Sequence, residues 1–408
     1  MRFARIVGAA VGAALLLTTS VSTASAASDT GAGLDRGALR GSLDAVHAAG
    51  MYGAFSSVRE GDQRWTGATG VADVDTGRPV EPGMRQRIGS ISKTFTAVAV
   101  LQQVERGRIA LDAPVADYVP DLIPGERGRT VTVRMLLNHT SGIGDYIVGA
   151  FPSLADDSVA SLDEERFRSI RPQELVRFGL AAPATGKPGE LPGTYANANY
   201  VIAGLILAKV TGQDAETYIT RNVIDRAGLR HTGYPRTPYI AGPHPRMYES
   251  WYGLIDPPRD YSVYDMSWAN TAGAVVSTTD DLNRFYRTLL GGGLIGPAAL
   301  TEMLRTVPVS GMKYGLGIYA LDLPCGRFWG HDGAVFGAGT YALSSRDGKR
   351  QFSMGWNLMK YQRFNADGTA QPSPIDDAIV GHLLKALCPD APATARQSLP
   401  EGLPGADL

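Results

Sequence analysis

The sequence predicts an α+β fold in which one mixed sheet is completed by both ends of the chain, with a helical lobe inserted between them. Strand patterns lie near both ends of the chain, and helical patterns fill its middle. The chain has 408 residues, of which 44% are hydrophobic and 19% charged, enough for one large core or two lobes around a cleft. We expect the sheet lobe to comprise residues 27–108 and 270–388, and the helical lobe residues 109–269.

The N-terminus has the pattern of a secretory signal peptide over residues 1–26. Arg2 and Arg5 precede an apolar stretch of 12 residues, 6–17, and Ala24-Ser25-Ala26 offers small residues at the cleavage positions. A membrane anchor is the alternative, but a bilayer span needs roughly 20 apolar residues. We therefore expect a secreted, extracellular protein without a membrane span. A formal net charge of -1 gives no support for binding nucleic acid.

The first elements are a helix, two strands and a second helix. Apolar residues recur at helical spacing over 34–50, and residues 54–59 and 63–71 read as strands around a Glu-Gly-Asp turn. After Gly89 the segment up to Gly107 is apolar on most sides, which predicts a buried helix.

The middle of the chain is rich in loops and proline, and its clearest helical pieces are residues 132–138, 171–179 and 199–212. Strand patterns resume near Gly315. The candidate strands are residues 328–329, 335–344 and 351–358, and an Asp-Gly hairpin turn at 346–349 joins the last two.

The chain ends in a helix that begins at Ser373, an N-cap residue followed by Pro374 and two acidic residues. Residues 389–408 are rich in proline and alanine and lack periodicity, so we expect a disordered tail. The only cysteines, Cys325 and Cys388, are expected to form a disulfide that ties this helix to the body.

Ser90-Ile91-Ser92-Lys93 is the first candidate for chemistry. If Ser90 opens the buried helix, Lys93 lies one turn along the same face and can act as the base that activates the hydroxyl. Burial lowers the pKa of a lysine, because it disfavours the ammonium. The spacing alone is weak, since Ser310-Gly311-Met312-Lys313 repeats it in a glycine-rich loop where no helix would hold the pair in register.

Two further motifs lie downstream. In Tyr195-Ala196-Asn197 a phenol can relay a proton and an amide can position a carbonyl or a lysine, although a capping turn before the next helix is the plainer interpretation. His331-Asp332-Gly333 reads as the start of a strand that could offer backbone groups to an extended substrate. A lone histidine is more often structural.

The three motifs together, in this order, resemble those of the serine β-lactamase and D-alanyl-D-alanine carboxypeptidase superfamily. Ser90-x-x-Lys93, Tyr195-x-Asn197 and His331-x-Gly333 match its three motifs. The His form is similar to the Streptomyces-type DD-peptidase and class C β-lactamase branch. Further similarity lies in segments 136–143 and 268–278. The resemblance implies a sandwich of helices, antiparallel sheet and helices with an inserted all-helical lobe.

The resemblance also implies a role for each matching residue. Ser90 would be the nucleophile, Lys93 its base and Tyr195 the proton relay. The substrate would be bound by the residues listed here: Asn197, Trp268, His331, Gly333 and Ala334. The backbone N–H groups of Ser90 and Ala334 would form the oxyanion hole. His139, in segment 136–143, is expected to order a loop.

Two departures bear on the substrate. Asp332 stands where the family usually has Thr or Ser, and a carboxylate there would repel a C-terminal substrate carboxylate unless it points away. The arginine with which the Streptomyces-type enzymes grip that carboxylate is absent from residues 317–322. Arg246 or Arg259 could replace it, but nothing in the sequence places either in the cleft.

We therefore expect a secreted serine acyl hydrolase, with a D-alanyl-D-alanine carboxypeptidase-like peptidase as the first hypothesis. An esterase or a D-amino-acid amidase or aminopeptidase is the alternative, because these need no substrate carboxylate. A β-lactamase and a non-enzymatic penicillin-binding regulatory module also stay open. No metal site and no cofactor are expected, since the six histidines are scattered and no phosphate-binding glycine loop is present. A small molecule or peptide is the expected substrate.

Overall fold

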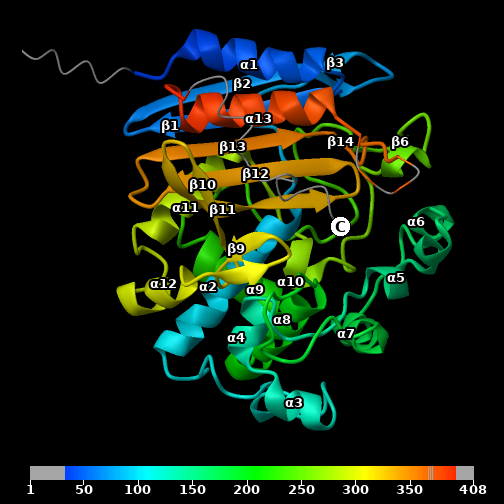
Figure 1. Ribbon diagram of the computed structural model, residues 1–408, viewed down its shortest axis with the longest axis vertical. Helices are drawn as coiled ribbons and strands as arrows, with labels where there is room; N and C mark the ends of the chain where they lie inside the picture. Colours follow the sequence, from blue (N-terminus) through cyan, green and yellow to red (C-terminus); the bar gives the residue numbers. More distant parts are fainter. Residues whose placement is uncertain (1–32, 366, 368, 370, 392–408) are drawn as a thin grey trace, which may run out of the picture. The chain divides into compact units, whose positions relative to one another are not determined.

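An antiparallel sheet of nine strands forms the centre of the computed structural model, which describes residues 33–391 except 366, 368 and 370 (Figure 1). The predicted signal peptide and residues 392–408 of the predicted tail lie outside the described residues. In spatial order the strands are β3 (Arg78–Pro79), β2 (Gln63–Asp73), β1 (Gly53–Glu60), β13 (Arg350–Trp356), β12 (Ala338–Ser345), β11 (Gly326–Val335), β10 (Tyr319–Leu323), β9 (Met312–Tyr314) and β8 (Val307–Val309).

Both ends of the chain complete this sheet, as the sequence predicted. The N-terminal strand β1 pairs with β13, and Ala54 lies opposite Trp356 in that register. The β12–β13 hairpin closes at the predicted Asp-Gly turn, where Gly348 has a φ of +67°. The contacts that close the sheet therefore join residues about 300 positions apart in sequence.

One face of the sheet is covered by the two terminal helices, α1 (Arg36–Ala48) and α13 (Pro374–Leu387), which lie side by side (Figure 1). Leu39, Leu43 and Val46 of α1 are buried at helical spacing. Ser373 caps α13 by accepting the backbone N–H of Asp376. Both helices therefore form as their capping residues and apolar spacing predicted.

The opposite face is covered by α11 (Thr279–Leu290), a helix that was not predicted from the sequence. Its signals are present: Thr278 accepts the N–H of Asp281 as N-cap, and Leu282, Phe285 and Leu289 are buried at helical spacing. Helices on both faces of an antiparallel sheet confirm the predicted sandwich.

Beyond α11 lie the two long helices of the site, α2 (Ser92–Glu105) and α8 (Ala198–Thr211), which contact each other. Two predicted helices match α4 (Val133–Leu137) and α7 (Pro172–Ala181). The shorter helices are α3 (Glu126–Thr130), α5 (Ile147–Ala150), α6 (Ala160–Glu164), α9 (Ala215–Ile219), α10 (Asn270–Gly273) and α12 (Pro297–Met303). The remaining strands, β4 (Gln86–Arg87), β5 (Tyr248–Glu249), β6 (Arg259–Asp260), β7 (Val276–Ser277) and β14 (Leu358–Met359), form two small sheets.

The predicted boundaries of β11 and β12 were wrong. The sequence placed a short strand at 328–329 and a second at 335–344, but β11 runs through to Val335 and β12 begins at Ala338. Gly330 and Gly333 interrupted the strand pattern, since glycine weakens strands. Each is needed for close approach: a Cβ on Gly330 would lie 1.9 Å from the Ala342 carbonyl oxygen. The third motif therefore lies inside a strand instead of at its start.

Cys325 and Cys388 form a disulfide whose Cα atoms are 5.5 Å apart. Cys325 lies in the turn between β10 and β11, and Cys388 directly follows α13. In the structure this bond joins the end of the last helix to the sheet.

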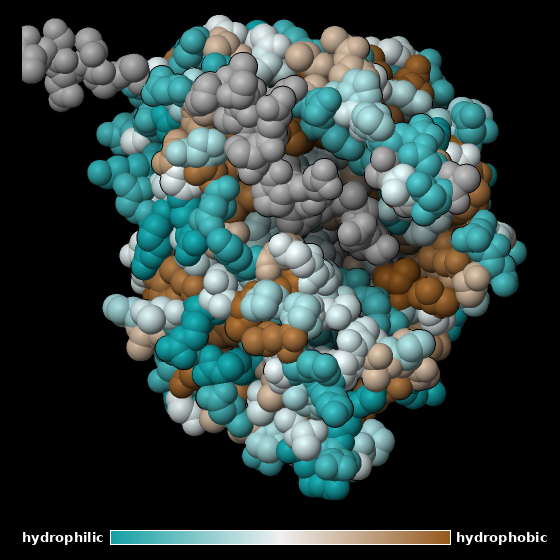
Figure 2. Space-filling view, in the orientation of Figure 1, coloured by the Kyte–Doolittle hydropathy of each residue, from teal (hydrophilic) through white to brown (hydrophobic). Residues whose placement is uncertain are grey.

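Large exposed apolar side chains are few in the described residues. Figure 2 shows hydrophobic residues in separate groups among hydrophilic ones on this face. Phe167 and Tyr239, the most exposed of the large ones, belong to different loops. None of the helices described is long and apolar enough to cross a membrane.

Candidate active site

Ser90 lies in a 3-10 turn, Gly89–Ile91, that leads directly into α2. Gly89 has a φ of +50°, and a Cβ there would lie 2.7 Å from both the N and the O of Ala334. Only glycine allows this approach, because any side chain would collide with the backbone of β11. The turn therefore holds Ser90 against the strand that contains the third motif.

Lys93 lies in the first turn of α2 with its side chain fully buried. Its Nζ is 2.9 Å from Ser90 Oγ, 2.7 Å from Asn197 Oδ1 and 2.9 Å from the carbonyl oxygen of Ala272. The spacing of Ser90 and Lys93 thus brings the two side chains into hydrogen-bonding distance, as the motif predicted.

Burial lowers the pKa of Lys93 to about 7, against the opposing effect of the Asp145 and Asp332 carboxylates. A substantial fraction of Lys93 is therefore a neutral amine near neutral pH. A neutral amine has two N–H groups and one lone pair. Because Asn197 Oδ1 and the Ala272 carbonyl can only accept, they take the two N–H groups and leave the lone pair for the Ser90 hydroxyl.

Tyr195 precedes α8, and its ring centroid lies 4.9 Å from Lys93 Nζ. Burial raises the pKa of Tyr195 well above its ordinary value, although the neighbouring Ser90 hydroxyl lowers it. The phenol is therefore protonated at neutral pH. Its hydroxyl makes no hydrogen bond of good geometry with any described residue, Ser90 included, so its proton is available for transfer.

His139 packs against the ring of Tyr195 and bonds to the residue that follows it. Its Nδ1 accepts the backbone N–H of Ala196 at 3.2 Å and lies 3.1 Å from Asn199 Nδ2, and its ring centroid is 4.1 Å from that of Tyr195. Burial lowers the pKa of His139 well below its ordinary value, and the nearby Lys93 adds to this. A neutral His139 therefore fixes the loop that presents Tyr195, which is the role expected for it.

Gly333 and Ala334 bring β11 against the Ser90 turn. A Cβ on Gly333 would lie 1.9 Å from the carbonyl oxygen of Ile88 and 3.1 Å from the backbone nitrogen of Ser90. The backbones of β11 and of the nucleophile are therefore in direct contact. Ser90 and Ala334 both line the same pocket, and the oxyanion hole expected from their N–H groups stays a prediction.

His331 lies on β11 with both ring nitrogens engaged within the protein. Nδ1 is 2.5 Å from the carbonyl oxygen of Asp332, so it carries the proton, and Nε2 accepts from the Tyr314 hydroxyl at 2.9 Å. Burial lowers the pKa of His331 to about 3, and Lys93 adds to this. His331 is not among the residues that line the pocket, so its predicted contact with substrate stays a prediction.

Asp332 points away from the Ser90 face of the sheet. The Cβ direction of Gly333 faces Ser90, and successive side chains of a strand point to opposite faces. On the other face Asp332 lies directly opposite Tyr341, and its carboxylate adds to the burial that raises the pKa of Tyr319. The side chain therefore does not meet a substrate at Ser90.

The pocket at Ser90 is small, and no charged side chain lines it. Its lining residues are Ser90, Tyr146, Asn197, Trp268, Ala269, Ala272, Gly273, Ala334 and Val335. The Tyr146 hydroxyl and the indole N–H of Trp268 are buried without a hydrogen-bond partner among the described residues. None of these lining residues carries a positive charge, so the pocket offers no cation for a substrate carboxylate.

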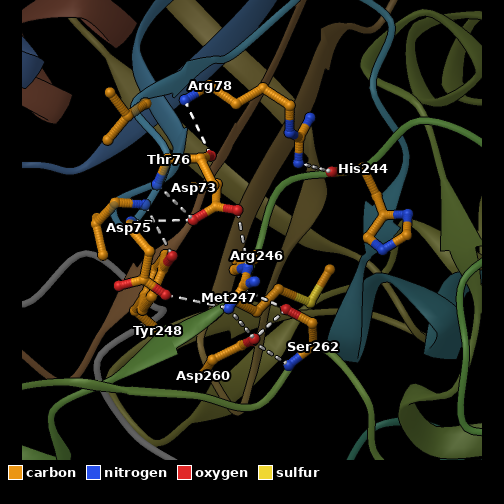
Figure 3. A network of polar contacts seen from close by, with 12 residues as sticks. Asp73, Asp75, Thr76, Arg78, His244, Arg246, Met247, Tyr248, Asp260 and Ser262 are labelled. Carbon is orange, nitrogen blue, oxygen red and sulfur yellow. Dashed lines mark hydrogen bonds and ion pairs between the residues drawn. The ribbon is translucent and has the colours of Figure 1, made fainter.

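The two arginines considered for that purpose pair with carboxylates elsewhere. Arg246 lies 3.1 Å from Asp73 and 3.4 Å from both Asp75 and Asp260, in the network of Figure 3. Arg259 pairs with Asp163. Neither lines the pocket at Ser90, so neither replaces the missing arginine in this structure.

The repeated spacing at Ser310 and Lys313 forms no second site. Ser310 is in the turn between β8 and β9 with a φ of +44°, and Lys313 pairs with Asp322 at 2.6 Å. Ser310 Oγ instead accepts the backbone N–H of Tyr195 at 3.1 Å. Ser310 therefore helps to hold the loop that contains Tyr195.

Three residues at the site were missed from the sequence. Asp145 accepts both N–H groups of Asn197, the Ala272 carbonyl contacts Lys93, and Tyr146 lines the pocket. Asp145 and Tyr146 lie two and three residues after the segment 136–143 that resembled the family, and Ala272 lies within the second such segment. Their proximity to those segments was the one available signal.

Comparison with known proteins identifies relatives over most of the chain. The family model described as Beta-lactamase matches residues 36–371. The protein named PbpX in Bacillus subtilis (strain 168) is 28% identical over 272 residues, and the esterase EstB of Burkholderia gladioli is 31% identical over 221 residues. The match covers 66% and 52% of this chain, and spans only 62% and 56% of the lengths of those relatives.

Solved structures share the fold. A D-stereospecific amidohydrolase from Streptomyces sp. is 33% identical with a TM-score of 0.76, and the match covers 88% of this chain and 100% of that one. A D-amino acid amidase from Ochrobactrum anthropi SV3 has a TM-score of 0.70 over 86% of this chain and 97% of that one, at 23% identity, which shows the fold alone.

Proposed function

The chain belongs to the Beta-lactamase family, and we propose that it is a secreted serine hydrolase that forms an acyl-enzyme on Ser90. The observation on which this rests is the buried Lys93 amine, 2.9 Å from Ser90 Oγ, with its two other contacts able only to accept hydrogen bonds. Every proposed step uses only groups of this chain, the substrate and water, so no cofactor is called for.

In the proposed acylation, the Ser90 hydroxyl gives its proton to neutral Lys93 while Oγ attacks the substrate carbonyl carbon. The backbone N–H groups of Ser90 and Ala334 stabilise the oxyanion that forms. Tyr195 donates its proton to the leaving nitrogen or oxygen and recovers one from the Lys93 ammonium. The bond to the leaving group breaks and the acyl group stays on Ser90. Water then attacks the ester by the reverse proton path, which releases the acid.

We infer that the substrates are amides or esters without a free carboxylate beside the scissile bond. The uncharged lining of the pocket supports this, because no cation compensates the desolvation of a buried carboxylate. The likeness to the D-stereospecific amidohydrolase and to the esterase EstB points to the same substrate class. This moves the amidase or esterase hypothesis ahead of the carboxypeptidase one.

A D-alanyl-D-alanine carboxypeptidase remains the second candidate. The orientation of Asp332 favours it, since the residue that would have repelled the substrate carboxylate lies on the other face of the sheet. What this candidate lacks is an attractive cation in the pocket.

Turnover assays with three substrates separate these candidates. The protein without residues 1–26 is incubated with D-phenylalanine amide, a short p-nitrophenyl ester and a D-Ala-D-Ala-terminated peptide, with Ser90→Ala as control. We expect turnover of the amide or the ester and little of the peptide. Efficient turnover of the peptide alone would favour the carboxypeptidase. A β-lactam is added as a fourth compound, and its hydrolysis without turnover of the other three would favour a β-lactamase.

A fluorophosphonate tests the nucleophile independently of the substrate. We expect a mass increase on the peptide that contains Ser90, absent in Ser90→Ala. No adduct with either this reagent or a β-lactam would leave a non-enzymatic binding module as the better account. Secretion is tested by the mass of the protein released from its native host, which should lack residues 1–26 and contain an oxidised Cys325–Cys388 pair.

A further inference from the structure

Asp145 is a buried carboxylate beside the site that belongs to none of the three motifs. It lies between α4 and α5, and its Oδ2 accepts the backbone N–H of Asn197 at 2.5 Å and the side-chain Nδ2 at 3.0 Å. Its Oδ1 accepts the N–H of Ile147 at 3.0 Å. All three partners donate, so the structure is satisfied by an ionised carboxylate, which only accepts.

This arrangement determines which way the Asn197 amide faces. Because Nδ2 is directed to Asp145, Oδ1 is directed to Lys93 Nζ at 2.7 Å. With the amide turned by half a rotation, Nδ2 would face the lysine and Oδ1 would face the carboxylate. The contact with Asp145 would then be unfavourable, since it would pair two acceptors, and Nδ2 could bond to neutral Lys93 only through its lone pair.

The direction of the amide in turn determines the direction of the Lys93 lone pair. Asn197 Oδ1 and the Ala272 carbonyl both accept, so they hold the two N–H groups of the neutral amine. The tetrahedral nitrogen then has one direction left for its lone pair, and Ser90 Oγ lies there at 2.9 Å. A flipped Asn197 would instead offer an N–H to the lone pair and compete with Ser90.

We propose that Asp145 is a positioning residue that aims the base at the nucleophile through Asn197. It does not itself line the pocket, and it acts on the reaction through Asn197, which does. The inference rests on the proposed function, because it requires Ser90 to be activated by Lys93. A purely structural role, such as holding the start of α5 through Ile147, makes different predictions.

The test compares Asp145→Asn with wild type by the rate at which a fluorophosphonate labels Ser90 across a range of pH. An amide at residue 145 cannot accept all three N–H groups, so the Asn197 amide loses its preferred direction. We expect the limiting labelling rate at high pH to fall by roughly tenfold or more, as misplaced catalytic groups do. The melting temperature reports separately on the fold.

A double-mutant cycle shows whether the effect runs through Asn197. In an Asn197→Ala background, Asp145→Asn should change the limiting rate by less than about twofold, since there is no amide left to orient. An equal loss in both backgrounds would overturn the proposal in favour of a structural role. Asp281→Asn, which removes another mostly buried carboxylate that accepts an N–H and a hydroxyl, is the matched control and should leave labelling unchanged.

The pH profile supplies a second readout, which reports the charge of Asp145 at Lys93 separately from the stability of the fold. The groups facing Lys93 are those listed here: Asp145 and Asp332, whose charges raise its pKa, the neutral His139 and His331, and the protonated Tyr195 and Tyr200. Loss of the Asp145 charge lowers the pKa of Lys93, so the acid limb of the labelling profile should move to lower pH. An unmoved limb would contradict the proposal.

Failure of the proposed function and failure of the role proposed for Asp145 give different results in these experiments. If wild type is never labelled, the proposed function fails. If wild type is labelled and Asp145→Asn labels equally fast with the same pH profile, only the role of Asp145 fails. Should Asp145→Asn not fold, Asp145→Ser keeps one acceptor oxygen and removes the charge, and the same rate loss and the same shift to lower pH are expected of it.

Discussion

Replacing Lys93 with methionine tests how strongly its burial opposes the charged form. Burial lowers the pKa of Lys93 from 10.5 to about 7 in the folded protein, whereas a lysine in the unfolded chain keeps its proton until about pH 10.4. Between these pKa values the unfolded chain binds one proton more than the folded one. The free energy of unfolding of wild type must therefore rise with pH in that window.

The sign and size of this change in the free energy of unfolding follow from the linkage between proton binding and folding. The destabilisation that burial of Lys93 causes is fully present below about pH 7, decreases as the pH rises, and is absent above about pH 10.5. One pKa unit corresponds to about 1.4 kcal/mol, so wild type should gain roughly 2 to 3 kcal/mol relative to Lys93→Met between about pH 7.5 and about pH 9.5. Methionine fills a similar volume and does not titrate, so other titrating groups cancel in the difference.

Urea unfolding of both proteins at about pH 7.5, 8.5 and 9.5 measures this difference. Lys313→Met is the matched control, because it changes the exposed lysine of the repeated spacing, which pairs with Asp322 at the surface. Its difference from wild type should show no comparable slope. A Lys93→Met difference that stays constant over the same range would refute the argument that burial holds the amine neutral. The variant should also lose labelling of Ser90.

Three other variants test the geometry of the site and the fold. Gly333→Ala should lower stability by about 1 to 3 kcal/mol and slow labelling of Ser90, measured by urea unfolding and mass spectrometry, since its Cβ would lie 1.9 Å from the Ile88 carbonyl oxygen. Tyr195→Phe should lower turnover by roughly 10²- to 10⁴-fold with almost no change in melting temperature, because the lost hydroxyl relays the proton; unchanged turnover would exclude the relay. Cys325→Ser combined with Cys388→Ser should lower the free energy of unfolding by about 4 kcal/mol, given the sequence separation of 63 residues.

What could be predicted from the sequence was determined by short-range geometry or by repeated patterns. Ser90 and Lys93 are three residues apart, so a helix brings them together without any knowledge of the rest of the fold. The hairpin at Gly348 and the helix begun by Ser373 follow from residues within one turn of each other. The meeting of both chain ends in one sheet followed from the strand patterns at both ends.

What escaped prediction depends on contacts between distant parts of the chain. Asp145 reaches Asn197 across 52 residues, and no local pattern marks a carboxylate as the partner of a particular amide. The gap between the predicted strands 328–329 and 335–344 was wrong for a related reason. Glycine weakens a strand locally, but here the sheet and the Ser90 turn approach so closely that nothing larger fits.

Asp332 shows how a residue can change its meaning once its direction is known. In the sequence it stands between His331 and Gly333 and suggested repulsion of a substrate carboxylate. Strand alternation turns it to the far face, among tyrosines, where it cannot meet the substrate. Its charge still raises the pKa of Lys93, together with that of Asp145, while burial lowers it to about 7. Asp332 therefore bears on the reaction through the strength of the base, and without the two carboxylates Lys93 would be a weaker one.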